Sequence, residues 1–177
     1  DPLLPYLDEI YIDLGVDENT QKLRLEAGEA DGVFDQFALS PQSLRELREA
    51  PGLTLADSVG PRIFYLALNN DGIFADKGLR QAVAHAMTTD FTVRFGGLAE
   101  PWSPLMSSTS AQSDPEGTVT YAHDPEAAAA LLESAGYDGT PVKIVYDVTD
   151  PYTTQNATAL TQDLEAVGFT VELTGQQ

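Results

Sequence analysis

VKIVYDVTDPYTTQNATALTQDLEAVGFTVELT, residues 142–174, is the stretch that decides the fold class. It begins and ends with short apolar runs rich in β-branched and aromatic side chains, which predict two strands. The middle places Leu160, Leu164 and Val167 on one helical face, and Gly168 marks the helix end. The predicted elements are a strand at 142–148, a helix at 152–167 and a strand at 169–174. Strand, helix and strand in this order indicate an α/β protein.

Earlier parts of the chain alternate between further helix and strand patterns. Helices are predicted where an Asp or Ser able to cap a helix precedes spaced apolar residues, as at Asp17, Ser40, Asp76 and Asp124. Apolar or alternating runs predict strands at 6–16, 53–59 and 60–70, and a strand or an extended segment at 32–39. The run at 60–70 is nearly continuous, which predicts burial on both faces. Residues 96–117 are rich in Ser, Pro and Gly, and we expect a long exposed loop there.

The composition restricts the classes of function. Nine Lys and Arg against 28 Asp and Glu give a net charge of −19, which disfavours binding to nucleic acid or to an anionic membrane surface. The hydrophobic fraction of 42% is enough to form a core. The sequence has no cysteine, so disulfides, thiolate nucleophiles and Cys-ligated metal sites are excluded. No run approaches the roughly 20 apolar residues of a membrane-spanning helix.

A search for catalytic and metal-binding motifs finds little. The two histidines, His85 within a predicted helix and His123 before a helix cap, are isolated from each other and form no HExxH motif. The serines of 103–113 lack a GxSxG motif, and neither phosphate-binding glycine motif is present. Acidic residues at 13–19 and 147–150 offer oxygen ligands, but the calcium-loop spacing is missing. We expect no catalytic residue, no metal and no cofactor.

Four phrases occur in an order that is typical of one family. They are RLEAGEAD, FYLALNNDGIFADKGLRQAVAHAMTTD, YAHDPEAAAALLESAGYDG and LTQDLEAVGFTVEL. In this order the chain resembles the extracytoplasmic solute-binding proteins of the peptide/nickel type, which serve ABC importers. The resemblance covers essentially the whole chain. Two departures stand in the second phrase, where Gly78 and Leu79 replace the usual Val-Arg, and Thr88, Thr89 and Asp90 replace Ile-Asp-Arg.

The resemblance implies a fold and a domain organisation. It implies a periplasmic-binding-protein-like fold of type II, α/β, with two lobes made of mixed sheets flanked by helices. We expect this chain to be an internal part of such a protein. Residues 1–60 are expected to be the end of lobe one and the crossover, and residues 61–177 the second, ligand-closing lobe, truncated at its C-terminus.

The resemblance also implies ligand contacts after the first phrase and at the strand that enters the second lobe. These positions correspond to Phe34, Asp35 and Gln36 and to the stretch 60–65. Within that stretch Arg62 is expected to face a carboxylate, and Tyr65 to stack or hydrogen-bond. Trp102, the only tryptophan, is a further candidate. Core packing is the alternative for Phe64 and Tyr65, anchoring of the loop for Trp102, and a solvated turn for Asp35.

The function implied by the resemblance is capture of an oligopeptide or similar small solute outside the cytoplasm and delivery to a membrane permease. The parent protein would be periplasmic or lipid-anchored at the outer face of the cell membrane. The solute stays open between peptides, nickel complexes, haem and sugars. The alternative is a stand-alone acidic protein–protein interaction domain of a cell-surface assembly. A hydrolase is disfavoured, because no catalytic motif was found.

Overall fold

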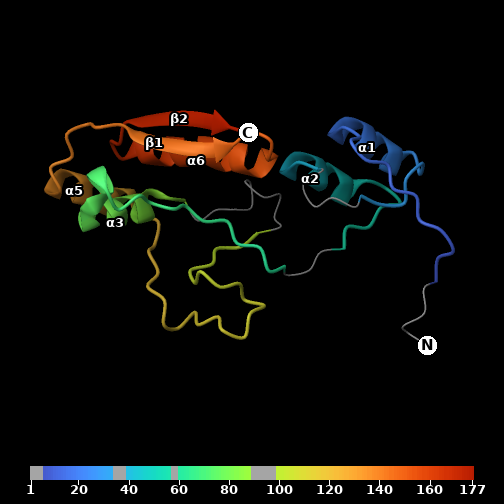
Figure 1. Ribbon diagram of the computed structural model, residues 1–177, viewed down its shortest axis with the longest axis horizontal. Coiled ribbons are helices and arrows are strands. Elements are labelled where there is room, and N and C mark those ends of the chain that lie inside the picture. The colour runs from blue at the N-terminus through green and yellow to red at the C-terminus, as the bar shows by residue number, and fades with distance from the viewer. Residues whose placement is uncertain (1–5, 34–38, 57–59, 89–98) are drawn as a thin grey trace. The chain divides into compact units, whose positions relative to one another are not determined.

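The computed structural model describes residues 6–33, 39–56, 60–88 and 99–177. The chain divides into two compact units, Asp1–Leu55 and Ala56–Gln177, which we call unit 1 and unit 2. The elements follow one another in the order shown in Figure 1. All four helices predicted upstream of residue 142 are present, and each is capped at its predicted residue.

Unit 1 contains two short helices, α1 (Glu18–Glu26) and α2 (Pro41–Glu49). The Asp17 carboxylate accepts a hydrogen bond from the backbone of Thr20, and Ser40 caps α2 by accepting from Ser43. The helices are joined by Glu18, whose carboxylate accepts from the Ser40 N–H at 2.7 Å and from the Ser43 hydroxyl at 2.6 Å. A Lys22–Glu46 ion pair adds a second polar link between them.

Unit 2 begins with an extended segment and continues into η1 (Gly72–Ala75), α3 (Lys77–Ala86) and α5 (Pro125–Ser134). Asp76 caps α3 through the N–H of Leu79. The Arg80 guanidinium reaches back over this cap and donates to the carbonyl oxygens of Phe74 and Ala75, at 2.6 and 3.0 Å. Arg80 therefore ties η1 to α3.

The predicted strand–helix–strand unit is present as β1 (Val142–Asp147), α6 (Pro151–Ala166) and β2 (Val171–Gln176). The two strands pair in parallel, with Val142 opposite Val171. The helix contacts both strands and runs beside them in Figure 1. The second strand starts two residues later than predicted, because Gly168 turns the chain at a φ of +105° and Phe169 is buried.

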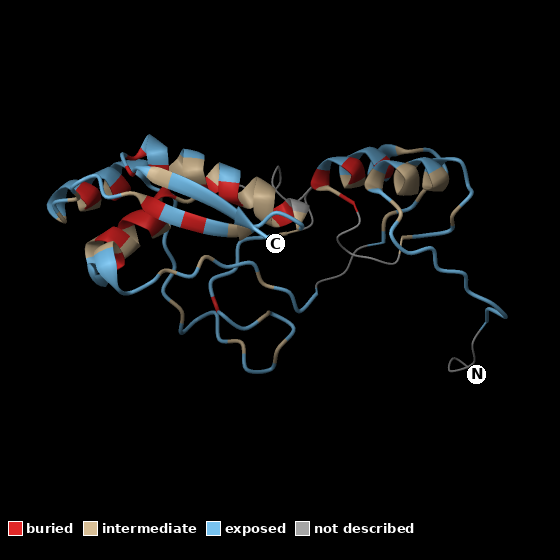
Figure 2. Ribbon diagram, turned by 45° about the horizontal axis from the view of Figure 1, so that its top comes forward, coloured by how far each residue is buried: buried red, intermediate tan, exposed pale blue. Residues whose placement is uncertain are grey.

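A single apolar cluster forms the core of unit 2. It takes side chains from α3, α5, β1 and α6, which appear as red segments on the facing sides of these elements in Figure 2. The face predicted on α6 is confirmed, since all three of its residues are buried. The buried members are Phe74, Leu79, Ala82, Val83, Ala86, Ala128, Leu132, Val142, Ile144, Ala157, Leu160, Leu164, Val167 and Phe169.

Three predicted strands, and the strand alternative for 32–39, are not found in the described residues. The segments at 6–16 and 60–70 lie in no strand, and neither do the described parts of 32–39 and 53–59. The expected two-sided burial of 60–70 is also wrong, since Phe64 is 38% and Tyr65 73% exposed. A strand needs a neighbour to bond its N–H and C=O groups, and β1 and β2 are the only paired strands described. An apolar pattern predicts the side-chain arrangement but supplies no such neighbour.

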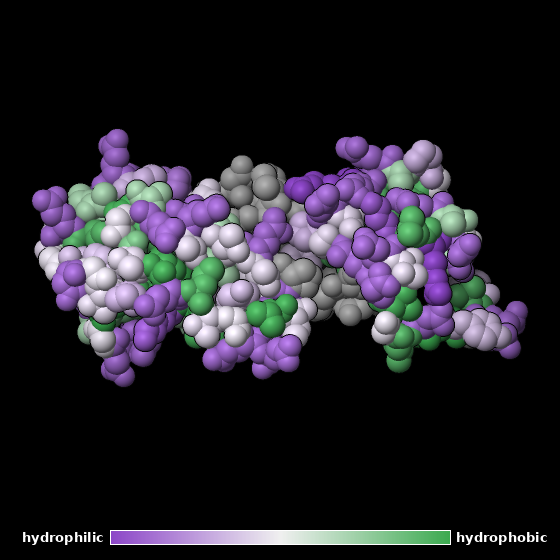
Figure 3. Space-filling view, turned by 90° about the horizontal axis from the view of Figure 1, so that it is seen from above, coloured by the Kyte–Doolittle hydropathy of each residue, from purple (hydrophilic) through white to green (hydrophobic). Residues whose placement is uncertain are grey.

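The surface is largely hydrophilic, in keeping with the net charge of −19. Hydrophobic side chains, green in Figure 3, interrupt it in both units. Those of unit 1 include Tyr6, Ile10, Tyr11, Ile12 and Leu14. Within the described ranges, no helix is both long enough and apolar enough to cross a membrane.

Candidate functional site

The start of unit 2 brings predicted ligand residues next to the first turn of α6. The Nη2 atom of Arg62 lies 3.1 Å from Oδ2 of Asp150, a residue 88 positions later in the sequence. The side chain of Asp150 is 15% exposed and that of Arg62 is 37% exposed. This pair is therefore partly shielded from water, which strengthens it relative to a fully exposed ion pair.

Aromatic rings extend this contact. The Arg62 guanidinium carbon lies 4.3 Å from the centroid of the Phe64 ring, a cation–π arrangement. The Phe64 ring is 6.2 Å from the ring of Tyr152, with 31° between their planes. Tyr152 belongs to the first turn of α6 and is buried. Arg62 and Phe64 thus contact the same turn, one through a carboxylate and one through a ring.

Asp150 also begins α6. Its Oδ1 atom accepts hydrogen bonds from the backbone N–H groups of Tyr152 and Thr153, at 2.8 and 3.3 Å. A carboxylate here satisfies helix N–H groups that lack a partner within the helix, and its charge suits the positive end of the helix dipole. One carboxylate therefore caps the helix and holds Arg62.

Beside it, at the end of β1, a second aspartate is held by a threonine. Thr149 donates two hydrogen bonds to Oδ1 of Asp147, one from its hydroxyl at 2.6 Å and one from its backbone N–H at 2.8 Å. These hydrogen bonds favour the charged carboxylate and hold the pKa of Asp147 below its usual value. Asp147 therefore carries its charge at neutral pH.

A loop that carries the only tryptophan approaches the same segment. The indole N–H of Trp102 donates to the carbonyl oxygen of Met106 at 2.8 Å. The next residue, Ser107, donates through its hydroxyl to the carbonyl oxygen of Gly60 at 3.2 Å. The structure therefore places the loop containing Trp102 against the beginning of the 60–65 segment.

The predicted site residues differ in what the structure shows of them. Arg62 is engaged by Asp150, as described above. Tyr65 and Trp102 remain open to solvent, 73% and 40% exposed. Phe34, Asp35 and Gln36 lie outside the described residues. The described part of the site is thus a surface that presents aromatic side chains next to a paired charge.

Sequence reasoning missed three residues that support this surface from below or beside it: Asp150, the buried Tyr152 and Ser107. Asp150 stands immediately before Pro151 and a helical pattern, a signal for a helix cap that could have drawn attention to it. No local signal connects Asp150 to Arg62, because the two residues are 88 positions apart. The contact of Ser107 with Gly60 spans 47 positions and is equally invisible in the sequence.

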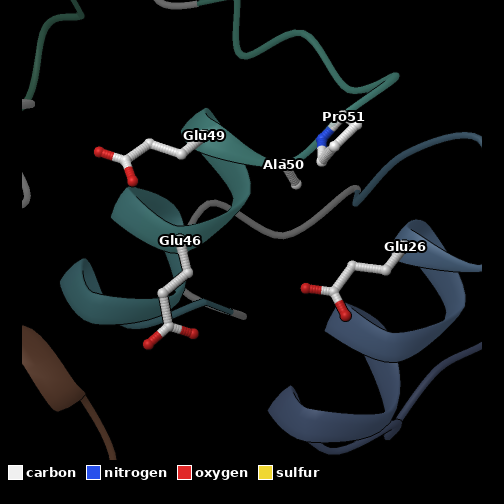
Figure 4. Close-up of a pocket in the computed structure, with 5 residues that line it drawn as sticks. All are labelled: Glu26, Glu46, Glu49, Ala50 and Pro51. Atoms are coloured by element: carbon white, nitrogen blue, oxygen red, sulfur yellow. The ribbon is translucent and has the colours of Figure 1, made fainter.

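A separate hollow lies in unit 1, between α1 and α2 (Figure 4). It is open and acidic, lined by Glu26, Glu46 and Glu49 together with Ala50 and Pro51. The three carboxylates do not converge on one point in Figure 4. Glu46 is already paired with Lys22, and the hydrogen bonds from Lys22 and Gln42 hold the pKa of Glu46 below its usual value. The hollow offers no arrangement for acid–base chemistry.

The acidic residues considered as calcium ligands have partners within the protein. Asp17 and Asp150 cap helices, and Asp13 pairs with Arg24 at 2.8 Å. Among the described residues, no group of three or more His, Asp or Glu side chains is placed to hold a metal ion. His85 contacts the carbonyl oxygen of Ala122 through Nδ1 at 2.9 Å and packs edge-on against Tyr121. It therefore fastens α3 to the segment before α5.

Comparison with known proteins identifies the family. The family model of bacterial extracellular solute-binding proteins, family 5, middle part, matches residues 1–177. The chain belongs to this family. The resemblance stated from the sequence is therefore confirmed, and with it the type II periplasmic-binding-protein-like fold, of which this chain shows a partial α/β section.

Solved structures agree with this assignment. The putative peptide binding protein AppA from Clostridium difficile is 21% identical, with a TM-score of 0.80, over 95% of this chain and 35% of that protein. NikA from Brucella suis, in complex with Fe(III)-EDTA, is 27% identical, with a TM-score of 0.78, over 91% and 36%. DppA from Helicobacter pylori, in complex with peptide STSA, is 22% identical, with a TM-score of 0.74, over 91% and 31%. The chain spans about a third of the length of these proteins.

Proposed function

We propose that this chain is part of the solute-binding component of a bacterial ABC importer, which captures a peptide or a similar small solute outside the cytoplasm and delivers it to a membrane permease. The observation that carries the proposal is the match of one solute-binding family over all 177 residues. Residues 1–60 are proposed to be the end of lobe one with the crossover, and residues 61–177 the second lobe, a boundary five residues after the one between unit 1 and unit 2. Closure of the lobes around the solute would bury it between them.

The solute surface of the second lobe is proposed to include Tyr65 and Trp102. Exposed aromatic rings support this role, because they offer large apolar faces and a polar group to a peptide at low entropic cost. Arg62 is proposed to contribute positive charge at the edge of this surface. Phe34, Asp35 and Gln36 are proposed to contact the solute from the first lobe, with Asp35 facing a peptide amino group.

Two solute classes are supported by relatives. DppA from Helicobacter pylori was solved with peptide STSA, and NikA from Brucella suis with Fe(III)-EDTA. For this chain we favour peptides. The aromatic surface at Tyr65 and Trp102 suits side chains and backbone groups of a peptide.

The test uses the protein isolated from its source organism, at the length at which it is made. Titration calorimetry against pools of di- to hexapeptides, and against nickel–histidine and iron chelates, would identify the solute class. We expect binding by at least one peptide pool. Saturable binding of the chelates alone would overturn the choice of peptides, and no binding of peptides, chelates, haem or sugars would overturn the proposed function.

Substitutions then locate the surface. Tyr65→Ala and Trp102→Ala are each expected to weaken peptide binding about tenfold, because an aromatic anchor in an interface contributes more than 1 kcal/mol. Tyr11→Ala is the matched control, since Tyr11 is also an exposed tyrosine but lies in unit 1 outside the predicted contacts. Equal effects of Tyr65→Ala and Tyr11→Ala would contradict the assignment of the surface.

A further inference from the structure

We propose that Asp150 is a positioning residue for the solute-facing segment at 60–65 and that it acts through Arg62. The solute-facing role of Tyr65 rests on the proposed function above. The contact between Asp150 and Arg62 stands independently of that function, because it is seen directly as an ion pair of 3.1 Å.

The two carboxylate oxygens of Asp150 have separate partners. Oδ1 accepts from the first backbone N–H groups of α6, and Oδ2 accepts from Arg62. The carboxylate is therefore immobilised by the helix before it meets the guanidinium. An ion pair gains most when one partner is already ordered, because less side-chain entropy is lost on forming it.

The segment contacts the first turn of α6 through two side chains, those of residues 62 and 64. Arg62 reaches Asp150, and Phe64 lies against the ring of the buried Tyr152. The guanidinium also stacks on Phe64, so the two contacts support each other. Because the segment lies in no strand, these side-chain contacts supply the positioning that a hydrogen-bonded ladder gives elsewhere. Residue 65 follows directly, and its ring projects into solvent.

A competing interpretation makes the opposite prediction. Asp150 could instead act only as a competitor that pairs with Arg62 in place of a solute carboxylate. In that case, loss of the Asp150 charge would free the guanidinium and tighten the binding of anionic solutes. If Asp150 positions the segment, the same loss allows residues 62–65 to move and weakens binding of neutral and anionic solutes alike. The sign of the change in affinity therefore separates the two roles.

Asp150→Asn removes the charge of residue 150 and keeps its ability to cap α6. Asparagine caps helices about as well as aspartate, so α6 is retained while the ion pair is lost. Asp124→Asn is the matched control, because Asp124 caps α5 in the same manner and makes no ion pair in the described part of the chain. Both variants change the net charge by the same amount.

Trypsin provides a readout that needs no solute. Cleavage of the Arg62–Ile63 bond requires the Arg62 side chain to leave Asp150 and enter the protease, so its rate follows the opened population. We expect Asp150→Asn to speed this cleavage about fivefold, and Asp124→Asn to leave it unchanged. Cleavage after Lys143, in β1, is the internal reference for opening of the whole unit. Equal Arg62 cleavage rates in the two variants would overturn the proposal.

Affinity for the solute found by calorimetry gives the second readout. We expect Asp150→Asn to weaken binding about fivefold in the native Arg62 background and to have no further effect beside Arg62→Gln, because the effect passes through Arg62. Tighter binding of an anionic solute, or an undiminished effect beside Arg62→Gln, would overturn the positioning role. If the unsubstituted protein binds no solute, the proposed function fails while the trypsin result still decides whether Asp150 holds the segment.

Discussion

Unit 1 and unit 2 differ in how much apolar burial stabilises each of them. Leu39 and Leu47 are buried in the described residues of unit 1, whereas unit 2 buries a much larger set of apolar side chains. In unit 2, apolar side chains from three helices and a strand form one buried cluster, and α6 covers a paired sheet. In the described residues of unit 1, α1 and α2 are joined by the Glu18 carboxylate, by two serines and by the Lys22–Glu46 pair. Apolar burial contributes several kcal/mol per side chain, whereas exposed polar contacts contribute about 1 kcal/mol or less. Unit 2 is therefore expected to fold stably where unit 1 opens readily.

The largest expected effect tests the core of unit 2. Leu164 is 1% exposed within the cluster, and Leu164→Ala is expected to lower the free energy of unfolding by about 2–5 kcal/mol through lost burial and a cavity. Urea denaturation followed by circular dichroism measures this change. Leu23→Ala is the control in unit 1, because Leu23 is 63% exposed, and its cost is expected to stay below about 0.5 kcal/mol. Equal costs would show that burial of Leu164 in the cluster does not stabilise unit 2.

A second test concerns close packing in unit 2. A Cβ atom added at Gly175, in β2, would lie 2.3 Å from the Cγ1 atom of Val148, so one of them must move. Gly175→Ala is expected to cost about 1–2 kcal/mol, and Val148→Ala in the same protein should recover most of it. Gly32→Ala in unit 1 is the control, since its added Cβ would have no atom within 4 Å. Thermal unfolding of the four proteins gives the comparison, and failure of Val148→Ala to restore stability would refute the packing argument.

The parts of the fold that sequence could predict are those that depend on neighbours along the chain. Capping by Asp17, Ser40, Asp76 and Asp124 is confirmed at each of these four helices, because a cap is decided within three residues. The apolar face of α6 was correct for the same reason. The order of four phrases also identified the family, which the match over the whole chain confirms.

Features that depend on distant residues could not be predicted. The strand pattern at 60–70 says nothing about a hydrogen-bonding neighbour, and within the described residues that segment has no paired strand. The Arg62–Asp150 pair, on which the candidate site is built, joins residues 88 positions apart. The sequence pointed to Arg62 as a candidate ligand contact but could not supply its partner within the protein, since charge alone does not select among 28 acidic residues.

A third test weakens the polar link in unit 1. Ser43→Ala removes the hydroxyl that donates to Glu18 at 2.6 Å, a hydrogen bond to a charged group. Amide hydrogen exchange in α1 and α2 is expected to become about fivefold faster, corresponding to about 1 kcal/mol, while α6 keeps its protection. Ser134→Ala in α5 is the control, because the Ser134 hydroxyl donates to the carbonyl oxygen of Ala130 within the same helix. Equal acceleration in α6 would mean that the two units open together.

The smallest expected effect is a dependence of unit 1 on pH. Burial raises the pKa of Glu18, but the hydrogen bonds from Ser40 and Ser43 and the nearby Lys22 charge outweigh it, so the folded pKa lies below the ordinary value of 4.5. Because the pKa of Glu18 is lower in the folded than in the unfolded chain, the charged form of Glu18 stabilises the folded state. This contribution is complete above the unfolded pKa and is lost as the pH falls through the lower folded pKa.

Exchange protection of α1 and α2, corrected for the intrinsic pH dependence of exchange, should therefore be level from neutral pH down to about pH 5 and decline below it. In Glu18→Gln the decline should be shallower, because the side chain no longer titrates. The remaining slope would come from Asp17 and Glu46, whose pKa values are lowered by hydrogen bonds from Thr20 and from Lys22. An identical decline in Glu18→Gln would place the acid sensitivity of unit 1 elsewhere and remove Glu18 as the group that joins its helices.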